Sequence, residues 1–139
     1  MNLLLTLENM PKFLEHVSDK AKNEGFDEKR VMEITVAVDE ALANIYYHAY
    51  KKNPKNLELV VLCDKAKLSI VIKDEGPFYD IIKHEDFNEA KDPSDLKLGG
   101  LGIKIIKKTV DKIKYYKESN KNILELIVYK TQQENKSNV

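Results

Sequence analysis

Three polar residues recur at four-residue intervals in one strongly periodic stretch of the chain: Glu40, Asn44 and His48. Residues four apart lie on the same side of an α-helix, so these three side chains share one stripe. The apolar residues of this stretch fall on a neighbouring arc, roughly 130° from the stripe. They are Val31, Ile34, Val38, Ala41, Leu42 and Ile45. The stripe therefore borders the buried face of the helix, where polar groups usually face a crevice or water.

The amide and the acid of this stripe suit metal binding and proton transfer. Asparagine disfavours helix interiors, so Asn44 in the middle of a helix indicates a role other than helix formation. Its amide oxygen is a suitable ligand for Mg²⁺, which binds through one or two protein oxygens together with substrate phosphates and water. Glu40 could act as a general base toward a hydroxyl or a water, whereas Asp39 points about 100° away. The alternative for Glu40 and Asn44 is a solvated polar flank.

For His48 we expect a structural role at the helix end, hydrogen-bonded to backbone, because imidazole is common at helix C-termini. A zinc site is not expected, since only His16 and His84 remain and neither has ligand spacing with His48. The single cysteine, Cys63, has no partner in the chain, which excludes a disulfide framework and favours a reducing cytoplasm.

A second candidate group follows a strand. Leu68, Ile70 and Ile72 alternate with other residues, and the same alternation places Asp74 on their face where the strand ends. A carboxylate that points into the protein needs a hydrogen-bonding partner. It could accept a hydrogen bond from an exocyclic amino group such as that of adenine, with Gly76 letting the base lie against the backbone. A turn-forming aspartate is the alternative.

Three glycines, in the run Gly99-Gly100-Leu101-Gly102, open a later helix. Unpaired backbone N–H groups at a helix N-terminus attract anions, and glycines let phosphate oxygens approach the backbone closely. A phosphate-binding turn and a flexible hinge are both consistent with this run. The spacing is not that of a P-loop or of the dinucleotide-binding fingerprint.

The elements that must position these residues can be predicted from periodicity and punctuation. We expect a strand at 3–7, a helix between Asn9 and Gly25, a helix from Asp27 to about Tyr50, a hairpin of strands at 57–63 and 68–72, a patternless segment at 78–98, a helix from Gly102, and strands at 112–116 and 123–129. A long patternless segment in a small domain is often a functional lid. This order is typical of an α+β two-layer sandwich with helices on one face of a mixed, mainly antiparallel sheet.

Size and charge set the remaining bounds. The 139 residues allow one domain, expected at 1–131, followed by a polar tail at 132–139. Equal numbers of basic and acidic residues, 23 of each, argue against a nucleic-acid groove or a membrane-seeking face. The apolar run at 1–5 is far shorter than a signal sequence or a spanning helix. A cytoplasmic protein is therefore expected.

In order and spacing, the three groups resemble the N, G1 and G2 boxes of the GHKL ATP-binding superfamily. The matching runs are Glu40-x-x-x-Asn44-x-x-x-His48-Ala49-Tyr50, Asp74-x-Gly76-Pro77-Phe78 and Gly99-Gly100-Leu101-Gly102-Ile103. The chain is most similar to small bacterial anti-sigma factors that are also serine/threonine protein kinases. The resemblance spans residues 3–129 and implies a Bergerat-type sandwich fold.

The resemblance implies ATP and Mg²⁺ as cofactors and a role for each motif. Glu40 is then the base, Asn44 binds Mg²⁺, Asp74 and Gly76 hold adenine, and the run from Gly99 to Gly102, Leu101 included, contacts phosphates. Such kinases phosphorylate a serine of a STAS-domain anti-anti-sigma protein and, in their other state, hold a sigma factor inactive. Family members tend to dimerise, so a homodimer is left open.

One departure from the family concerns the lid, where several members carry an arginine that reaches the phosphates. Arg30 is the only arginine of this chain, and it lies far from the lid in the sequence. Lys97 could substitute as a point charge without the bidentate fork of a guanidinium. A nucleotide-responsive binding module with little or no transfer activity is therefore a second hypothesis. The detached ATP domain of a sensor histidine kinase is a third, disfavoured because no phosphoacceptor helix precedes it.

Overall fold

The computed structural model describes residues 1–77 and 101–130, and the side chain of Leu101 is not among what it describes. In chain order its elements are β1 (Asn2–Leu4), α1 (Met10–Asn23), α2 (Glu28–Asn44), the π-helix η1 (Ile45–Ala49), β2 (Asn56–Cys63), β3 (Lys67–Asp74), α5 (Leu101–Thr109), β4 (Lys112–Glu118) and β5 (Lys121–Tyr129). The expected lid at 78–98 lies outside the described residues.

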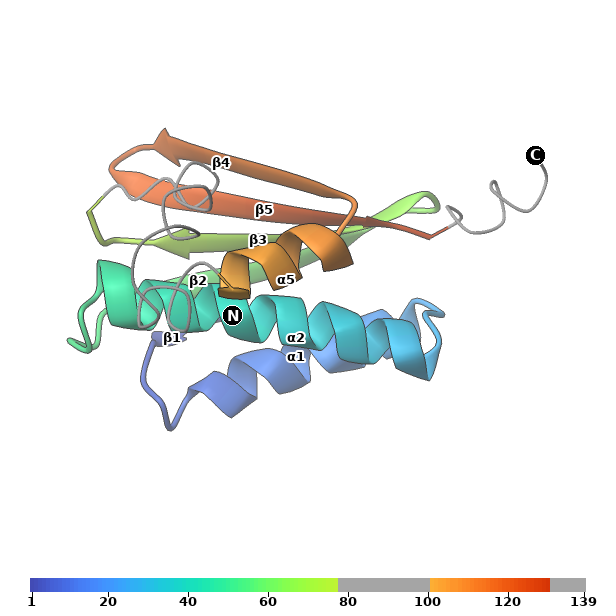
Figure 1. Cartoon of the computed structure of the whole chain (residues 1–139), viewed down its shortest axis with the longest axis horizontal. Helices are drawn as coiled ribbons and strands as arrows, with labels where there is room; N and C mark the ends of the chain where they lie inside the picture. The colour runs from blue at the N-terminus through green and yellow to red at the C-terminus, as the bar shows by residue number, and fades with distance from the viewer. Residues whose placement is uncertain (78–100, 131–139) are drawn as a thin grey trace.

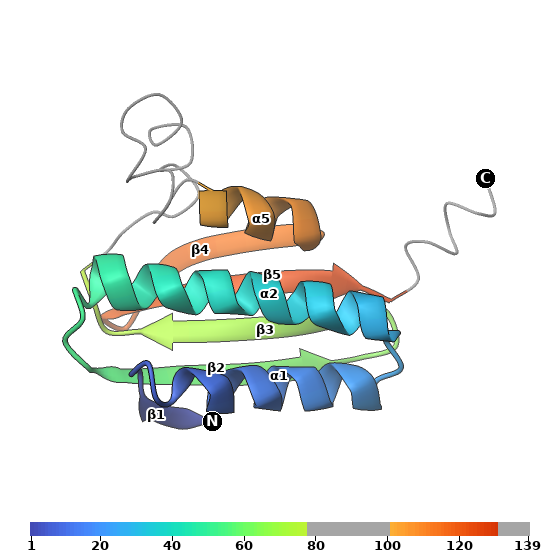
Figure 2. The same ribbon diagram turned by 60° about the horizontal axis from the view of Figure 1, so that its bottom comes forward.

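The described elements form two layers. Five strands make one sheet in the order β1-β2-β3-β5-β4, and each neighbouring pair is antiparallel. The helices α1, α2 and α5 all cover the same face of this sheet (Figures 1 and 2). The predicted α+β sandwich is confirmed, although the described strands include no parallel pair that would make the sheet mixed.

The core lies between the sheet and the helices, and period-2 alternation builds the strand side of it. Side chains with at most 2% exposure come from the strands at Leu57, Leu59, Leu68, Ile70, Ile72, Leu124, Leu126 and Val128. The predicted apolar arc of α2, from Val31 to Ile45, faces them and is buried throughout. Burying one such aliphatic side chain contributes roughly 1.5–3 kcal/mol, so this arc fixes the rotation of α2 and turns Glu40 and Asn44 toward its edge.

The connection between α1 and α2 follows its capping residues. Gly25 has a φ of 94°, its N–H donates to Lys22 O, and the N–H of Phe26 donates to Ala21 O, which together close the end of α1. Asp27 then caps α2, because its Oδ1 accepts from the N–H of Arg30 at 2.8 Å. Both helix boundaries agree with the prediction.

The N-terminal strand is shorter than predicted. β1 ends at Leu4 because Thr6 already begins the turn into α1: its hydroxyl and carbonyl oxygens both accept from the N–H of Asn9. Asn9 occupies the N-cap position without capping the helix, since its side chain donates to Leu4 O instead.

The second helix changes its hydrogen bonding before it ends, which the 3.6-residue period does not predict. From Ile45 to Ala49 the chain is a π-helix, closed by the N–H of Tyr50 donating to Ile45 O at 2.7 Å. This bond spans five residues instead of four. The predicted stripe therefore holds for Glu40 and Asn44, whereas His48 lies in the π-helical turn, out of step with them.

The last hairpin also differs from the prediction, which ended one strand at 116 and began the next at 123. Only Ser119 and Asn120 form the turn, with φ values of 50° and 66°, as a two-residue hairpin loop requires. β4 therefore continues to Glu118, and β5 begins at Lys121. As a consequence, Asn122 belongs to a strand and pairs in register with Asp74 of β3.

Candidate functional site

Five of the predicted site residues lie in the described parts of the chain with their side chains or backbone defined: Glu40, Asn44, Asp74, Gly76 and Gly102. Leu101 begins α5. Lys97, Gly99 and Gly100 lie outside the described residues. The end of η1, the end of β3 and the start of α5 all lie at the same end of the molecule (Figure 1).

Asp74 is the last residue of β3 and is only 2% exposed, as its place in the alternation predicts. Its Oδ1 accepts two hydrogen bonds, from the N–H of Gly76 and from Nδ2 of Asn122, each at 2.9 Å. Burial raises the pKa of the Asp74 carboxyl, and these two hydrogen bonds oppose that effect. Within the described part of the chain both of these bonds are made by Oδ1, so Oδ2 can accept from a ligand.

Asn122 is a site residue that sequence reasoning missed. It is 1% exposed, and its Nδ2 also donates to Gly76 O at 2.8 Å and Pro77 O at 3.3 Å. The amide thus ties the turn after β3 to the carboxyl of Asp74. Its Oδ1 is buried and finds no hydrogen-bond partner among the described residues. A usable sequence signal would have been an asparagine at the start of an otherwise apolar strand.

Asn44 carries the clearest mark of a binding function in the described structure. It ends α2 and is 4% exposed, and neither its Nδ2 nor its Oδ1 has a hydrogen-bond partner within the described ranges. A buried polar group without a partner costs about 1–3 kcal/mol, so natural folds seldom keep one unless something satisfies it. The amide is therefore available to a ligand, as an Mg²⁺ site requires.

Glu40 lies against the first turn of α5. A Cβ placed on Gly102 would lie 2.6 Å from Glu40 Oε2, closer than real Cβ contacts, so any larger residue here would push the Glu40 carboxylate aside. Burial, with a smaller contribution from the neighbouring Asp39 carboxylate, raises the pKa of Glu40. The α2 stripe thereby meets the first turn of α5 at Gly102.

Gly76 permits a second close approach, between the turn after β3 and the π-helix. A Cβ on Gly76 would lie 3.0 Å from Ala49 Cβ and 3.3 Å from Ala49 O. Tyr50, only 2% exposed, strengthens this junction: its hydroxyl donates to Asn56 O at 2.5 Å and accepts from the N–H of Glu75 at 3.0 Å. The predicted adenine-binding turn is thus held directly against the end of the helix that carries Asn44.

The arrangement defines a class of protein, and comparison with known families agrees with it. Residues 3–128 match the histidine kinase-like ATPase domain, which is most of the chain, so the chain belongs to this family. The family indicated by the three motifs is thereby confirmed. Membership of this family implies ATP binding.

Individual relatives are more distant. The chain is 34% identical over 95 residues to the serine-protein kinase RsbW of Staphylococcus epidermidis, and 35% identical over 96 residues to RsbW of Staphylococcus aureus strain JH9. Each match covers 63% of this chain and 59% of the relative. The match therefore leaves about two fifths of each relative's length without a counterpart here.

No helix at 1–77 or 101–130 is both long enough and apolar enough to cross a membrane. Within the same ranges, no three or more His, Cys, Asp and Glu side chains gather in a way that could hold a metal ion.

Proposed function

We propose that this chain is an ATP- and Mg²⁺-dependent protein-serine kinase and anti-sigma factor of the cytoplasm. It would phosphorylate a STAS-domain anti-anti-sigma protein and, in its other state, sequester a sigma factor. The observation that carries the proposal is the buried amide of Asn44, which lacks a partner among the described residues and lies one helical turn beyond Glu40 on α2. The two staphylococcal relatives are serine-protein kinases by name, which supports the same reaction.

The described residues fit a bound nucleotide. Asp74 would accept the exocyclic amino group of adenine through Oδ2, because Oδ1 already accepts from Gly76 and Asn122. Such a contact would favour adenine over guanine, since guanine offers no donor at that position. Gly102, with Gly99, Gly100, Leu101 and Lys97 as the remaining proposed phosphate contacts, would receive the phosphates at the start of α5.

Bound ATP would supply the phosphoryl group, and Mg²⁺ would neutralise charge on its phosphates. The protein's own part is then positioning and proton transfer. Asn44 would offer its amide oxygen to the metal, and Glu40 would accept the proton that the substrate serine hydroxyl loses. A carboxyl with a raised pKa is a better base near neutral pH than an ordinary one, because catalytic efficiency is greatest when the pKa lies near the working pH.

The decisive experiment is a phosphotransfer assay with each STAS-domain protein of the same genome in turn, one of which is expected to be the substrate. The chain, ATP and Mg²⁺ should yield a phosphoserine on that protein, detected by mass spectrometry. Glu40→Gln should abolish most of the product and retain ATP binding, while Asp39→Asn, which removes the neighbouring exposed carboxylate, should retain both. Absence of phosphoserine with every STAS protein of the same genome would refute the kinase assignment.

A nucleotide-responsive binding module without transfer activity remains the second candidate, and one observation favours it. Arg30, the only arginine, is engaged at the opposite end of α2 by Glu33, Thr109 O and Asp111, so it is not available to the phosphates. ATP binding with no phosphorylated product, together with co-purification of a sigma factor, would select this alternative over the kinase.

A further inference from the structure

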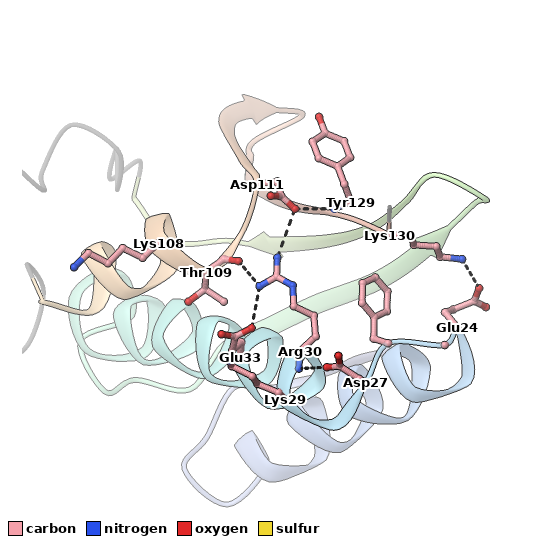
Figure 3. A pocket seen from close by; sticks show the side chains of 12 residues that line it. Glu24, Asp27, Lys29, Arg30, Glu33, Lys108, Thr109, Asp111, Tyr129 and Lys130 are labelled. Carbon is pink, nitrogen blue, oxygen red and sulfur yellow. Dashed lines mark hydrogen bonds and ion pairs between the residues drawn. The ribbon is translucent and has the colours of Figure 1, made fainter. Parts of the chain in front are cut away.

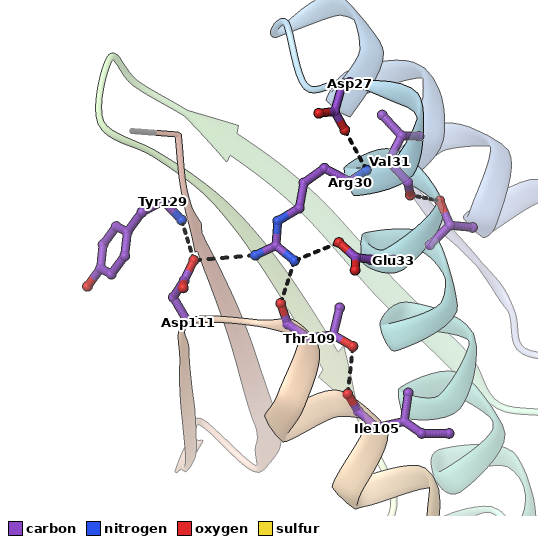
Figure 4. Close-up of polar contacts among 9 residues, drawn as sticks. Asp27, Arg30, Val31, Glu33, Ile105, Thr109, Asp111 and Tyr129 are labelled. Atoms are coloured by element: carbon purple, nitrogen blue, oxygen red, sulfur yellow. Dashed lines mark hydrogen bonds and ion pairs between the residues drawn. The ribbon is translucent and has the colours of Figure 1, made fainter. Parts of the chain in front are cut away.

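Arg30 connects three elements at the end of the molecule opposite the candidate nucleotide site. Its Nη1 donates to Thr109 O at 2.7 Å and to Glu33 Oε1 at 3.3 Å, and its Nη2 lies 3.5 Å from Asp111 Oδ2 (Figure 4). Asp111 Oδ2 in turn accepts from the N–H of Tyr129 at 2.8 Å. One guanidinium thereby joins the first turn of α2 to the end of α5 and, through Asp111, to the end of β5.

The contact with Thr109 acts on the end of α5 itself. The last carbonyl groups of a helix have no partner within the helix and carry the negative end of its dipole. A cation that donates a hydrogen bond to one of them therefore stabilises the helix end. Arg30 makes this contact across 79 residues of sequence. Its planar fork can bond the carbonyl and both carboxylates at once, which the single ammonium of a lysine cannot do with the same geometry.

Apolar packing covers only one side of this end of α5, where Val110 follows Thr109 and is 7% exposed. A cavity of about 490 Å³ opens beside Arg30, between the loop before α2, the end of α5 and the end of β5 (Figure 3). Acidic and basic side chains both line it, and Lys29 and Lys108 are two of the basic ones. At the C-terminal end of α5, the polar contacts of Arg30 therefore add to the packing of Val110, whereas Ile103 and Ile106 bury the rest of the helix.

The two ends of α5 are mechanically linked. α5 has nine residues, a length of about 13 Å, and runs antiparallel to α2: Thr109 lies against Arg30 and Gly102 lies against Glu40. A short helix moves as a rigid unit, so a shift at Thr109 displaces its first turn as well. Gly102 lies very close to the Glu40 carboxylate, because a Cβ there would be 2.6 Å from Oε2. A displacement of the first turn of α5 would therefore change its contact with Glu40.

We propose that Arg30 is a positioning residue for the phosphate end of the nucleotide site: it holds α5 so that the glycine-bearing first turn lies in the correct place against Glu40. The inference rests on the proposed function, since it assumes that α5 receives the phosphates. Arg30 touches no nucleotide itself and acts through Thr109 and Asp111. The adenine end of the site, at Asp74 on β3, does not depend on it.

Calorimetric titration of ATP and of adenosine, each with Mg²⁺, separates the two ends of the site. Arg30→Met should weaken ATP binding about tenfold, toward the lower end of couplings between distant sites, and leave adenosine affinity unchanged. Arg30→Lys should fall between Arg30→Met and the wild type, because it restores the charge without the fork. Lys29→Met, which removes another cation from the same cavity wall, should match the wild type with both ligands.

A purely structural role for Arg30 predicts a different result: ATP and adenosine affinities would fall by the same factor, or neither would fall, and either outcome overturns the inference. Hydrogen exchange gives an independent measurement, because amides of α5 should exchange faster in Arg30→Met than in Lys29→Met, with those of α1 unchanged. If Arg30→Met does not fold, the same comparison is made with Arg30→Lys. A wild type that binds neither ligand refutes the proposed function, and the inference falls with it.

Discussion

Replacing Asp74 by asparagine tests the adenine contact with little change of shape. Asp74 Oδ1 accepts from Gly76 N–H and Asn122 Nδ2, both at 2.9 Å. An asparagine that places its carbonyl oxygen at the same point keeps both bonds. Its NH₂ group then occupies the position of Oδ2, where the proposed adenine amino group also donates. The substitution therefore places the asparagine NH₂ group against the adenine amino group, two donors facing each other. The acceptor for Gly76 and Asn122 is preserved.

The size of the effect follows from the charge of the lost acceptor. A hydrogen bond to a charged group contributes about 1.5–3 kcal/mol, and each 1.4 kcal/mol corresponds to about tenfold in affinity. Asp74→Asn should therefore bind ATP roughly ten- to a hundredfold more weakly. The fold should not suffer, because burial raises the pKa of the Asp74 carboxyl and ionised Asp74 thus destabilises the folded state above that pKa. At pH 7 the variant should unfold at the same temperature as the wild type or higher.

The assay combines ATP titration with thermal unfolding at pH 7. Asp64→Asn is the matched control, because it neutralises an exposed aspartate in the turn of the same hairpin, where Oδ1 accepts from Ala66 and Lys67 N–H. The control should leave ATP affinity at the wild-type value. If Asp74→Asn binds ATP within twofold of the wild type while folded, then Asp74 is not the adenine acceptor and the reasoning fails.

Three further substitutions test the surroundings of the site. Tyr50→Phe leaves two backbone groups without their hydroxyl partner and should lower the free energy of unfolding by about 1–3 kcal/mol in a urea titration; Tyr116→Phe, exposed on β4, should change it little. Glu40→Gln should raise the melting temperature at pH 7, because burial destabilises the ionised form of Glu40 in the folded state and thereby raises its pKa. The increase should disappear as the pH falls below the ordinary glutamate pKa, where the carboxyl is protonated in both states. An equal increase at both pH values would contradict this reasoning. Gly102→Ala should displace the Glu40 carboxylate and reduce phosphoserine formation about a hundredfold, with adenosine binding retained; an unchanged rate would show that Glu40 is not the base.

Much of the site could be predicted because local rules decide it. The period of two along β3 is enough to place Asp74 on the buried face, since a strand cannot turn one side chain without turning its neighbours. The apolar arc of α2 likewise orients Glu40 and Asn44 to its edge. Asp27 and Gly25 mark the boundary between α1 and α2 through side-chain and backbone bonding within a few residues. In each case the determining interactions are close in sequence.

What could not be predicted depends on interactions between distant segments. Asn122 pairs with Asp74 only because the final turn is reduced to Ser119 and Asn120, which adopt positive φ without glycine. The π-helix from Ile45 also lacks a sequence signal, since its apolar pattern is compatible with an ordinary helix. The role of Arg30 depends on Thr109, 79 residues away. The local rules that place the motifs do not predict strand register, a change in helix hydrogen bonding or contacts between distant segments.

Besides the unpaired Oδ1 of Asn122, which lies beside Asp74, the described structure contains three local conflicts that occur together. Asn44 is buried without a partner in the described ranges, and Asp74 and Glu40 are carboxyls whose pKa values burial raises. Each weakens the fold, whereas the strands and the apolar arc of α2 obey every packing rule. Conflicts that arose by chance would be scattered over the fold. Instead, Asn44 ends α2, Asp74 ends β3, and Glu40 lies against Gly102 in the first turn of α5. A ligand that donates to Asp74, brings a cation to Asn44 and a hydroxyl to Glu40 would resolve all three, and ATP with Mg²⁺ and a serine side chain has this combination.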